Sequence, residues 1–317
     1  MSTIAGSAQR VIIDTDIGDD IDDALAIWLA VKSPELDIAG ITTVYKQTHK
    51  RAQMVSALLR ATGRSDIPVV PGASLPLVSR QIYGKPVDPE EDPVQYLEEM
   101  RSEPVDTRWT AAEFIVRTAL EAEKPIALVT LGALTNVALA LRVKPEIAGR
   151  IAKIVVMGGA YDMNVSEYNF SCDPEAAQIV LGAGVPIVAV GLDVTFKCLL
   201  SERQMAAIRE SADPAAKLVM RMREYWASPY IYLHDPLAVA AVYREDLVRT
   251  ERRVIDIETG GTYTRGMSIS LSGMNWHRPA ADSYVRVCTA VEQQAFMDLY
   301  MERILAFTPI EERDGIA

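Results

Sequence analysis

The chain has 317 residues, of which 49% are hydrophobic and 24% charged, so it is long enough for a large soluble domain with a substantial core. Its formal net charge of −11 excludes nucleic acid as the main partner, because binding a polyanion requires a basic surface. We expect no membrane span and no signal peptide, and three widely spaced cysteines favour a reducing, cytoplasmic compartment over a disulfide framework.

The first predicted strand, Val11–Ile13, leads directly into a loop that is crowded with acids. Ten consecutive residues contain six aspartates: Asp14, Asp16, Asp19, Asp20, Asp22 and Asp23. An apolar stripe at helical spacing follows between Ala24 and Ala30 and predicts an amphipathic helix. The acidic loop is therefore expected at the carboxyl end of a strand, where open α/β sheets bind their ligands.

The crowding of the aspartates predicts a metal site. One or two acids can cap a helix, but six repel one another and raise each other's pKa unless a cation lies among them. Calcium takes about six to eight oxygen ligands and suits this loop, while capping with a solvated acidic loop is the alternative. An EF-hand is excluded because Gly18, Asp19 and Leu25 stand where it needs an acid, glycine and glutamate. A haloacid-dehalogenase phosphatase motif also fails, since it needs threonine or valine at the position of Gly18.

Predicted strands and helices alternate along the rest of the chain. Further strands are predicted at Asp37–Val44, Ile67–Val70, Pro125–Thr130, Ile154–Met157, Pro186–Val190, Arg253–Ile257 and Thr262–Ser270. Helices are predicted at Arg51–Arg60, Ala111–Ala122, Leu134–Arg142, from Asp173, and at Glu202–Arg209, Pro214–Trp226, Pro236–Tyr243 and Val291–Leu305. Residues 72–108 are predicted to form a long functional loop or lid. This alternation predicts an α/β protein, an open, mostly parallel sheet with helices on both faces, in one domain over residues 1–317.

Polar residues follow the strand that ends at Met157. Asn164, Glu167 and Asn169 lie in one loop, which is either an Asx-rich turn or part of a binding site. If the segment is extended, Glu167 and Asn169 share one side, as an edge that binds a ribose would require.

His234-Asp235-Pro236 begins a predicted helix. Asp235 fits the N-cap position before a proline and still has a second oxygen for a metal, whereas a lone histidine beside a cap is more often structural. Four aromatic residues lie just upstream and either belong to the core or stack on a planar base: Tyr225, Trp226, Tyr230 and Tyr232.

Taken in order, several of these segments resemble the inosine–uridine-preferring nucleoside hydrolases. The segments are Asp14-Thr-Asp16-Ile-Gly18 with Asp22-Asp23-Ala-Leu, Ile41-Thr-Thr-Val44, Leu128-Val-Thr-Leu-Gly132-Ala-Leu-Thr-Asn136, Val156-Met157-Gly-Gly159, Glu167-Tyr-Asn169 with Asp173-Pro-Glu-Ala, and His234-Asp-Pro-Leu-Ala238. They cover residues 11 to about 243, and Gly266-Met267 fits a further segment. The resemblance implies a Rossmann-like fold, a bound Ca²⁺, hydrolysis of the N-glycosidic bond of ribonucleosides to ribose and free base, and a homodimer or homotetramer.

The resemblance also implies roles for particular residues. Asp16 would be the general base and a calcium ligand, and His234 would assist the leaving base. The other implied calcium ligands are Asp23, Asp235 and the backbone carbonyl of Leu131. The implied contacts to ribose are Asp22, Met157, Asn164, Glu167 and Asn169.

Two departures from the family pattern bear on the site. Two additional residues separate Gly18 from the Asp22–Asp23 pair, so Asp20 competes for the role of one of them. Lys46 and Gln47 stand where the family has Gly-Asn. We predict that Gln47 replaces the asparagine against the sugar and that Lys46 points toward the Asp19–Asp20 part of the loop or to solvent.

The segment Gln81-Ile-Tyr-Gly84 stands near the place of a His-Gly signature that the chain lacks. These departures motivate an alternative, a non-catalytic homologue that binds calcium and nucleosides without turnover. Retention of Asp16, Asp235 and His234 favours the enzyme.

Overall fold

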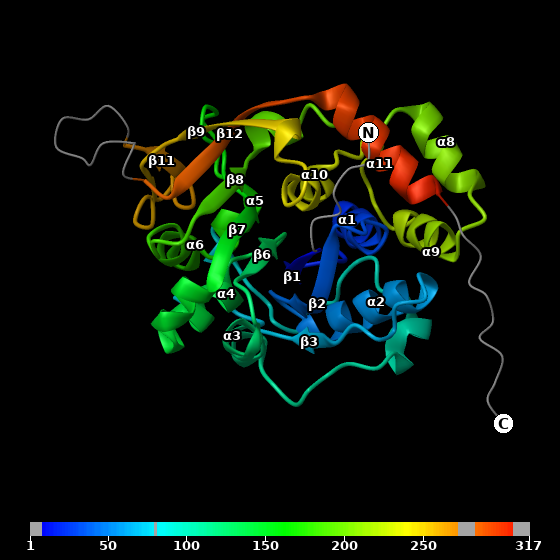
Figure 1. Cartoon of the computed structure of the whole chain (residues 1–317), viewed down its shortest axis with the longest axis horizontal. Coiled ribbons are helices and arrows are strands. Elements are labelled where there is room, and N and C mark those ends of the chain that lie inside the picture. The colour runs from blue at the N-terminus through cyan, green and yellow to red at the C-terminus, as the bar shows by residue number, and fades with distance from the viewer. Residues whose placement is uncertain (1–7, 79–80, 272–282, 307–317) are drawn as a thin grey trace.

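The computed structural model describes residues 8–78, 81–271 and 283–306. Its main sheet has the order β3-β2-β1-β6-β7-β8-β12-β9 (Figure 1). Neighbouring strands are parallel except for β12 and β9, so the predicted open, mostly parallel sheet is confirmed. The strands are β1 (Gln9–Thr15), β2 (Leu36–Thr43), β3 (Val69–Pro71), β6 (Ile126–Thr130), β7 (Ile151–Met157), β8 (Ile187–Val190), β9 (Val248–Arg252) and β12 (Val285–Val291).

Helices cover both faces of this sheet because its central strands are apolar on both sides. In β1, Val11 and Ile13 belong to one core cluster and Ile12 to the other. The first cluster includes residues of α1 (Asp22–Val31), α2 (Thr48–Ala61), α8 (Glu202–Glu210), α9 (Pro214–Arg223), α10 (His234–Ala241) and α11 (Gln293–Leu305). The second includes residues of α3 (Ala111–Glu121), α4 (Thr135–Val143) and α6 (Pro174–Leu181), which lie on the opposite side of the sheet in Figure 1.

The remaining elements are short. Two small hairpins pair β4 (Gln81–Ile82) with β5 (Lys85–Pro86) and β10 (Ile255–Ile257) with β11 (Ser268–Ser270). The single-turn helices are α5 (Tyr168–Cys172) and α7 (Leu192–Thr195), and the 3₁₀ turns are Glu98–Ser102, Pro145–Arg150 and Glu245–Leu247. None of the helices in the described ranges is long and apolar enough to cross a bilayer.

The sequence prediction was incomplete in the tail. Strand β12 was not predicted, although it pairs with β8 and β9 inside the main sheet. Its sequence, Val-Arg-Val-Cys-Thr-Ala-Val, is rich in β-branched residues and contains the strand signal that could have identified it. The predicted strand Thr262–Ser270 is a strand only at Ser268–Ser270, because Gly266 takes a left-handed turn with φ of 86°.

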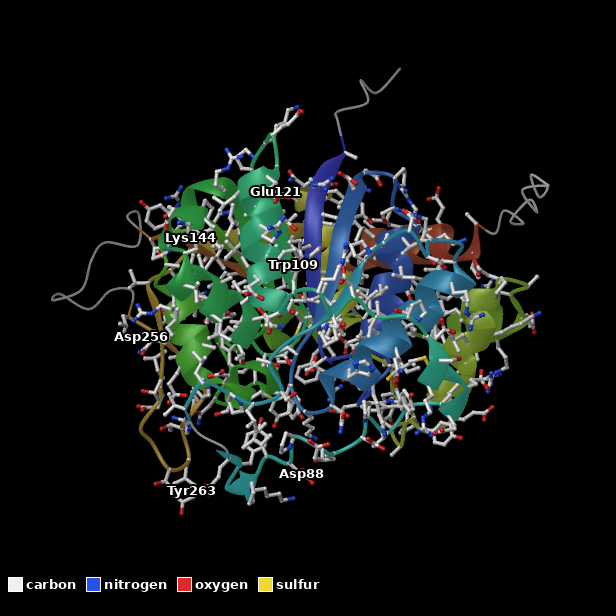
Figure 2. All side chains as sticks on the ribbon, turned by 90° about the horizontal axis from the view of Figure 1, so that it is seen from below. Asp88, Trp109, Glu121, Lys144, Asp256 and Tyr263 are labelled. Atoms are coloured by element: carbon white, nitrogen blue, oxygen red, sulfur yellow. The ribbon has the colours of Figure 1, made fainter. Side chains whose placement is uncertain are left out.

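The parallel strands place their carboxyl ends at one edge of the molecule. In Figure 2, β1 runs from the side of Glu121 toward the side of Asp88 and Tyr263. The loops that follow β1, β2, β6, β7 and β8 therefore meet at this second side, as expected for the binding edge of an open α/β sheet.

Candidate active site

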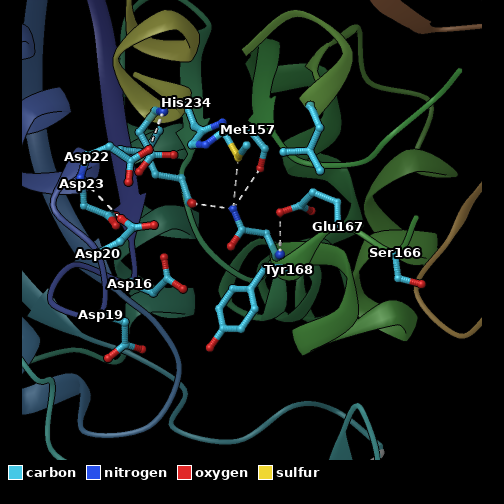
Figure 3. Close-up of a pocket in the computed structure, with 14 residues that line it drawn as sticks. Asp16, Asp19, Asp20, Asp22, Asp23, Met157, Ser166, Glu167, Tyr168 and His234 are labelled. Carbon is cyan, nitrogen blue, oxygen red and sulfur yellow. Dashed lines mark hydrogen bonds between the residues drawn. The ribbon is translucent and has the colours of Figure 1, made fainter. Parts of the chain in front are cut away.

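A cavity of about 200 Å³ opens among these loops (Figure 3). Aspartates form one wall, and Glu167 and Ser166 lie on the other (Figure 3). The complete lining is Asp16, Asp19, Asp20, Asp22, Asp23, Leu131, Met157, Ser166, Glu167, Tyr168, Asn169, Leu192, His234 and Asp235. The structure thus brings all the predicted site residues together except Gln47 and Asn164.

Gln47 and Asn164 lie outside this cavity. The amide nitrogen of Gln47 donates a 2.6 Å hydrogen bond to Glu90, and Asn164 is exposed in the loop after β7. A contact between Gln47 and the sugar stays a prediction, which requires this side chain to leave Glu90. Lys46 does point toward the first loop, as predicted, with its Nζ 3.9 Å from Asp19 and 3.0 Å from Glu91.

The turn after β1 is fixed by close packing. Gly18 has φ of 120°, and a Cβ atom at this position would lie 2.5 Å from Cβ of Pro93. The turn therefore requires glycine on both conformational and steric grounds.

Arg51, which is fully buried in α2, holds the same turn from behind. Its guanidinium donates to the backbone carbonyls of Asp16, Ile17 and Tyr45, and to the carboxylate of Asp19 at 2.8 Å. Because these bonds fix both backbone and side chain, the acidic loop is ordered by the protein itself.

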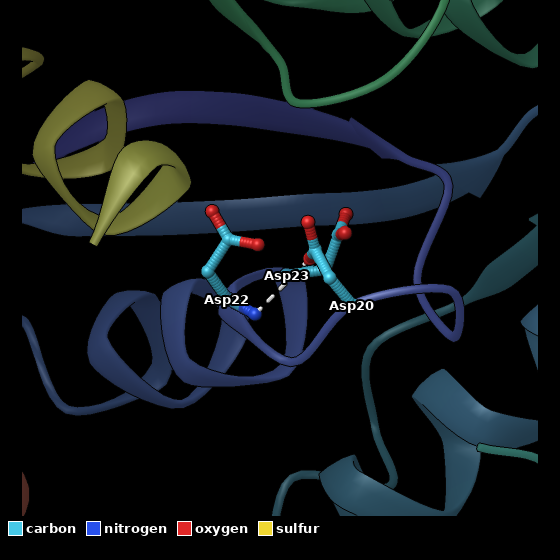
Figure 4. A group of neighbouring side chains, drawn as sticks. All are labelled: Asp20, Asp22 and Asp23. Carbon is cyan, nitrogen blue, oxygen red and sulfur yellow. Dashed lines mark hydrogen bonds between the residues drawn. The ribbon is translucent and has the colours of Figure 1, made fainter. Parts of the chain in front are cut away.

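Asp20, Asp22 and Asp23 gather at the start of α1 (Figure 4). One carboxylate oxygen from each lies within 4.8 Å of the others, a spacing that a metal ion can bridge. Neither Asp22 nor Asp23 is the N-cap, which is Ile21, and both lie in the first turn, where the helix dipole favours negative charge. The backbone amide of Asp235 donates to Asp22 at 3.2 Å and so ties the start of α10 to this group.

The acidic wall is unfavourable without a cation. Burial raises the pKa of Asp16 to about 8, an effect that Arg51 opposes, and raises the pKa of Asp22 to about 6. Burial followed by the neighbouring carboxylates raises the pKa of Asp235 well above its usual range. A bound cation would reverse these shifts, so the donor set fits a metal.

The loop after β6 completes the wall. The carbonyl of Leu131 accepts a 2.6 Å hydrogen bond from the Asn169 amide and keeps a second lone pair for another ligand. At Gly132, a Cβ atom would lie 2.7 Å from the Asp16 carboxylate, so glycine is needed for Asp16 to occupy its position. The sequence analysis missed Gly132, although a glycine directly after a strand is a signal for close approach.

The opposite wall is built differently from the prediction. Glu167 and Asn169 do not form an extended edge, because Glu167 is the N-cap of α5 and Asn169 lies within that helix. The Glu167 carboxylate accepts from the backbone amides of Gly159, Asn169 and Phe170 at 2.8 to 3.0 Å. Backbone amides therefore use most of the roughly four acceptor positions of this carboxylate and hold it in place.

His234 lies above the aspartates (Figure 3). Its Nδ1 is 2.7 Å from the hydroxyl of Thr195, and burial lowers its pKa, an effect that the Asp20 carboxylate opposes. Phe196 and Tyr232 pack against the imidazole with ring centroids at 5.3 and 5.6 Å.

The predicted aromatic cluster is therefore only partly present. Tyr232 contacts His234, whereas Tyr225 and Tyr230 are 57% and 60% exposed. The sequence analysis missed Phe196 and Tyr168. Two features of the sequence could have identified them: Phe196 follows strand β8 closely, and Tyr168 lies inside the Glu167–Asn169 segment.

An open, mostly parallel sheet, with buried carboxylates facing a polar wall and a histidine at its carboxyl edge, is the arrangement of an α/β enzyme. The match to a family sequence model is more specific and spans residues 11–298. The chain belongs to the inosine-uridine preferring nucleoside hydrolase family.

Individual relatives agree with this assignment. The chain is 35% identical to the pyrimidine-specific ribonucleoside hydrolase RihA of Escherichia coli O81 (strain ED1a), over 94% of this chain and 98% of that protein. A solved plant nucleoside hydrolase is 28% identical, with a TM-score of 0.82 over 94% of this chain and 99% of that one. A purine-preferring ribonucleoside hydrolase from Gardnerella vaginalis is 28% identical, with a TM-score of 0.78 over 93% and 98%.

Proposed function

We propose that this protein hydrolyses the N-glycosidic bond of ribonucleosides in a calcium-dependent reaction that gives ribose and the free base. The observation that carries the proposal is the single pocket in which the Asp16 carboxylate, the Glu167–Asn169 wall and His234 meet. Family membership supports the reaction type, and two of the relatives named above are ribonucleoside hydrolases.

The calcium proposal rests on the acidic wall. Asp16, Asp23, Asp235 and the Leu131 carbonyl would hold the ion, with Asp20 and Asp22 close enough to contribute. When bound, the ion supplies a fixed positive charge that orients a water and the ribose hydroxyls and lowers the water's pKa.

The residues of the chain would divide the chemistry as follows. Asp16 takes a proton from the water, whose oxygen forms a bond to C1′ while the bond to the base nitrogen breaks. Positive charge develops on the sugar, as in glycoside hydrolysis, and the carboxylates around it stabilise that charge. Glu167 and Asn169 hold the ribose, and Asp22 contacts a hydroxyl. His234 lies on the side where the base departs.

The calcium content of the purified protein, and its sensitivity to a chelator, directly test the metal assignment. Elemental analysis of protein purified without added metal should find about one calcium per chain, and a strong chelator should abolish hydrolysis. Absence of metal together with activity that resists the chelator would contradict the assignment.

The position of Gln47 favours a second candidate, the non-catalytic nucleoside-binding homologue, because this side chain does not reach the cavity. A panel of uridine, cytidine, inosine and adenosine distinguishes the two by measuring free ribose. The panel starts with pyrimidines because the RihA relative is pyrimidine-specific. Ribose release from at least one nucleoside supports the enzyme, whereas calorimetric binding without release supports the second candidate.

Two further expectations accompany the proposal. We expect a homodimer or homotetramer, which sedimentation measures directly, and we expect the enzyme to work in the cytoplasm on nucleosides released inside the cell. The oligomer follows from the family resemblance, and the compartment from the few, widely spaced cysteines.

A further inference from the structure

Thr195 is placed beside His234 by backbone pairing between two separate segments. An antiparallel bridge joins Leu199 to Tyr232, and the backbone hydrogen bonds on either side of it are 2.8 and 2.9 Å long. This pairing fixes the end of α7 against the start of α10. The Thr195 hydroxyl, on a side chain that is 0% exposed, therefore meets Nδ1 of His234 at 2.7 Å.

The direction of this hydrogen bond follows from the surroundings of the hydroxyl. Among the hydrogen bonds of the described residues, the one that the Thr195 hydroxyl makes is to His234. A fully buried hydroxyl needs an acceptor for its hydrogen, and Nδ1 of a neutral imidazole is an acceptor. The ring then carries its own hydrogen on Nε2.

Nε2 is the ring nitrogen that remains available to the cavity lined by His234. Phe196 and Tyr232 pack against the ring and limit its rotation. The result is an N–H donor held toward the side of the cavity where a base would leave.

We propose that Thr195 is a positioning residue, which fixes His234 in the tautomer that presents Nε2–H to the leaving base. This inference rests on the proposed function. As the bond between C1′ and the base breaks, its electron pair moves onto the base, and Nε2–H donates a hydrogen bond to it. The base then takes its proton from solvent water, so His234 ends the step in its starting form.

The kinetic test compares T195V, which keeps the shape but removes the hydroxyl, with T195S, which keeps the hydroxyl. Uridine has a poor leaving group, whereas p-nitrophenyl riboside releases a stable anion that needs no donor. We expect T195V to lower kcat for uridine by at least about 10-fold, since positioned acids contribute roughly 10²–10⁴-fold. KM and the hydrolysis of p-nitrophenyl riboside should stay near the wild-type values, and T195S should restore uridine hydrolysis.

Combination with H234A shows whether Thr195 acts through the histidine. In that background, T195V should cause no further loss on uridine, because the residues act as one unit. Equal losses on both substrates, an additive double variant, or failure of T195S to restore activity would each overturn the proposal. Melting curves confirm that each variant folds.

A spectroscopic test separates this inference from the proposed function. The chain has three histidines, so ¹⁵N-labelled imidazole signals can be assigned with H234A. Wild type and T195S should show the Nε2–H tautomer at His234, and T195V should lose it. If the wild type releases no ribose yet shows this tautomer pattern, the proposed function fails while the positioning by Thr195 stands. An Nδ1–H tautomer in the wild type overturns the positioning itself.

Discussion

The acidic wall of the pocket and the aromatic rings around it differ in burial and in origin. Asp16, Asp22 and Asp23 are 5 to 7% exposed and come from the end of one strand and the first turn of the next helix. Tyr168, which lines the pocket, and Phe196, which packs against His234, are 39% and 44% exposed and lie on or just after single-turn helices.

This difference indicates that the acidic wall must be rigid, whereas the aromatic rings need not be. Buried carboxylates are tolerated only if their geometry matches a cation, so the acidic wall must be set before the ligand binds. Arg51 and Gly132 serve this purpose, one by hydrogen bonding and the other by leaving room for Asp16. Half-exposed aromatic rings can change rotamer at small cost. We therefore expect the acidic wall to govern the reaction and the aromatic rings to govern which base is accepted.

The largest effect is expected from a substitution in the acidic wall. Asp16→Asn should lower kcat by roughly 10²–10⁴-fold, because the variant loses the general base. The loss should be similar on uridine and on p-nitrophenyl riboside, since the water must be deprotonated in both reactions. This equality is the opposite of the split expected for Thr195 and His234.

Asp19→Asn is the matched control, because it removes another acid from the same loop without touching the proposed base. If a folded Asp16→Asn protein kept more than about a tenth of wild-type kcat, another aspartate would be the base. Asp20 would be the first residue to test.

A second prediction concerns the stability of the metal-free protein. Burial raises the pKa of Asp14 to about 7, that of Asp16 to about 8 and that of Asp22 to about 6. The metal-free folded state therefore binds more protons than the unfolded chain between pH ~4 and ~8, and its stability should fall as pH rises through this window. Surface acids whose pKa is lowered by a salt bridge, such as Asp66, titrate below the window.

Calcium should remove this dependence, because it binds the deprotonated carboxylates of the folded state only. The measurement is the melting temperature at pH 5 and at pH 8, with chelator and with calcium. A melting temperature of the chelated protein that rises from pH 5 to pH 8 would show that these carboxylates are already neutralised by groups of the protein.

The acidic wall could be predicted from the sequence because its chemistry is local. The residues from Val11 to Leu25 form a strand, a turn and a helix, so the six aspartates are brought near one another within one short segment. His234 and Asp235 were also predictable, since the segment His234-Asp-Pro-Leu-Ala238 resembles the family and starts a helix.

The aromatic surroundings of His234 could not be predicted, because they are assembled by backbone pairing between segments that are far apart in the sequence. Thr195 is brought to His234 by the bridge between Leu199 and Tyr232, and no periodic pattern in the sequence predicts that bridge. The expectation for Gln47 depended on a single-residue analogy. It did not anticipate Glu90, a residue of the 72–108 loop that takes up the Gln47 amide.

The smallest expected effect concerns Lys46, which lies in the loop between β2 and α2. Its backbone has φ of 57°, a left-handed conformation that glycine adopts freely and that costs other residues roughly 1 kcal/mol. Its side chain pairs with Asp19 and Glu91, and such pairs near the surface contribute ~0.2–1 kcal/mol. K46G removes both the strain and the pairs, so its stability should stay within about 1 kcal/mol of wild type.

K46A separates the two contributions, because it removes the charge but keeps the Cβ atom in the left-handed conformation. We expect K46A to melt below K46G, and both to bind calcium more tightly than wild type, by less than about fivefold, since a cation beside Asp19 is gone. Equal melting temperatures would mean that the backbone here is unstrained. Weaker calcium binding in both variants would mean that Lys46 stabilises the acidic loop more than it repels the ion. The loop before α2 would then contribute to the rigidity of the acidic wall.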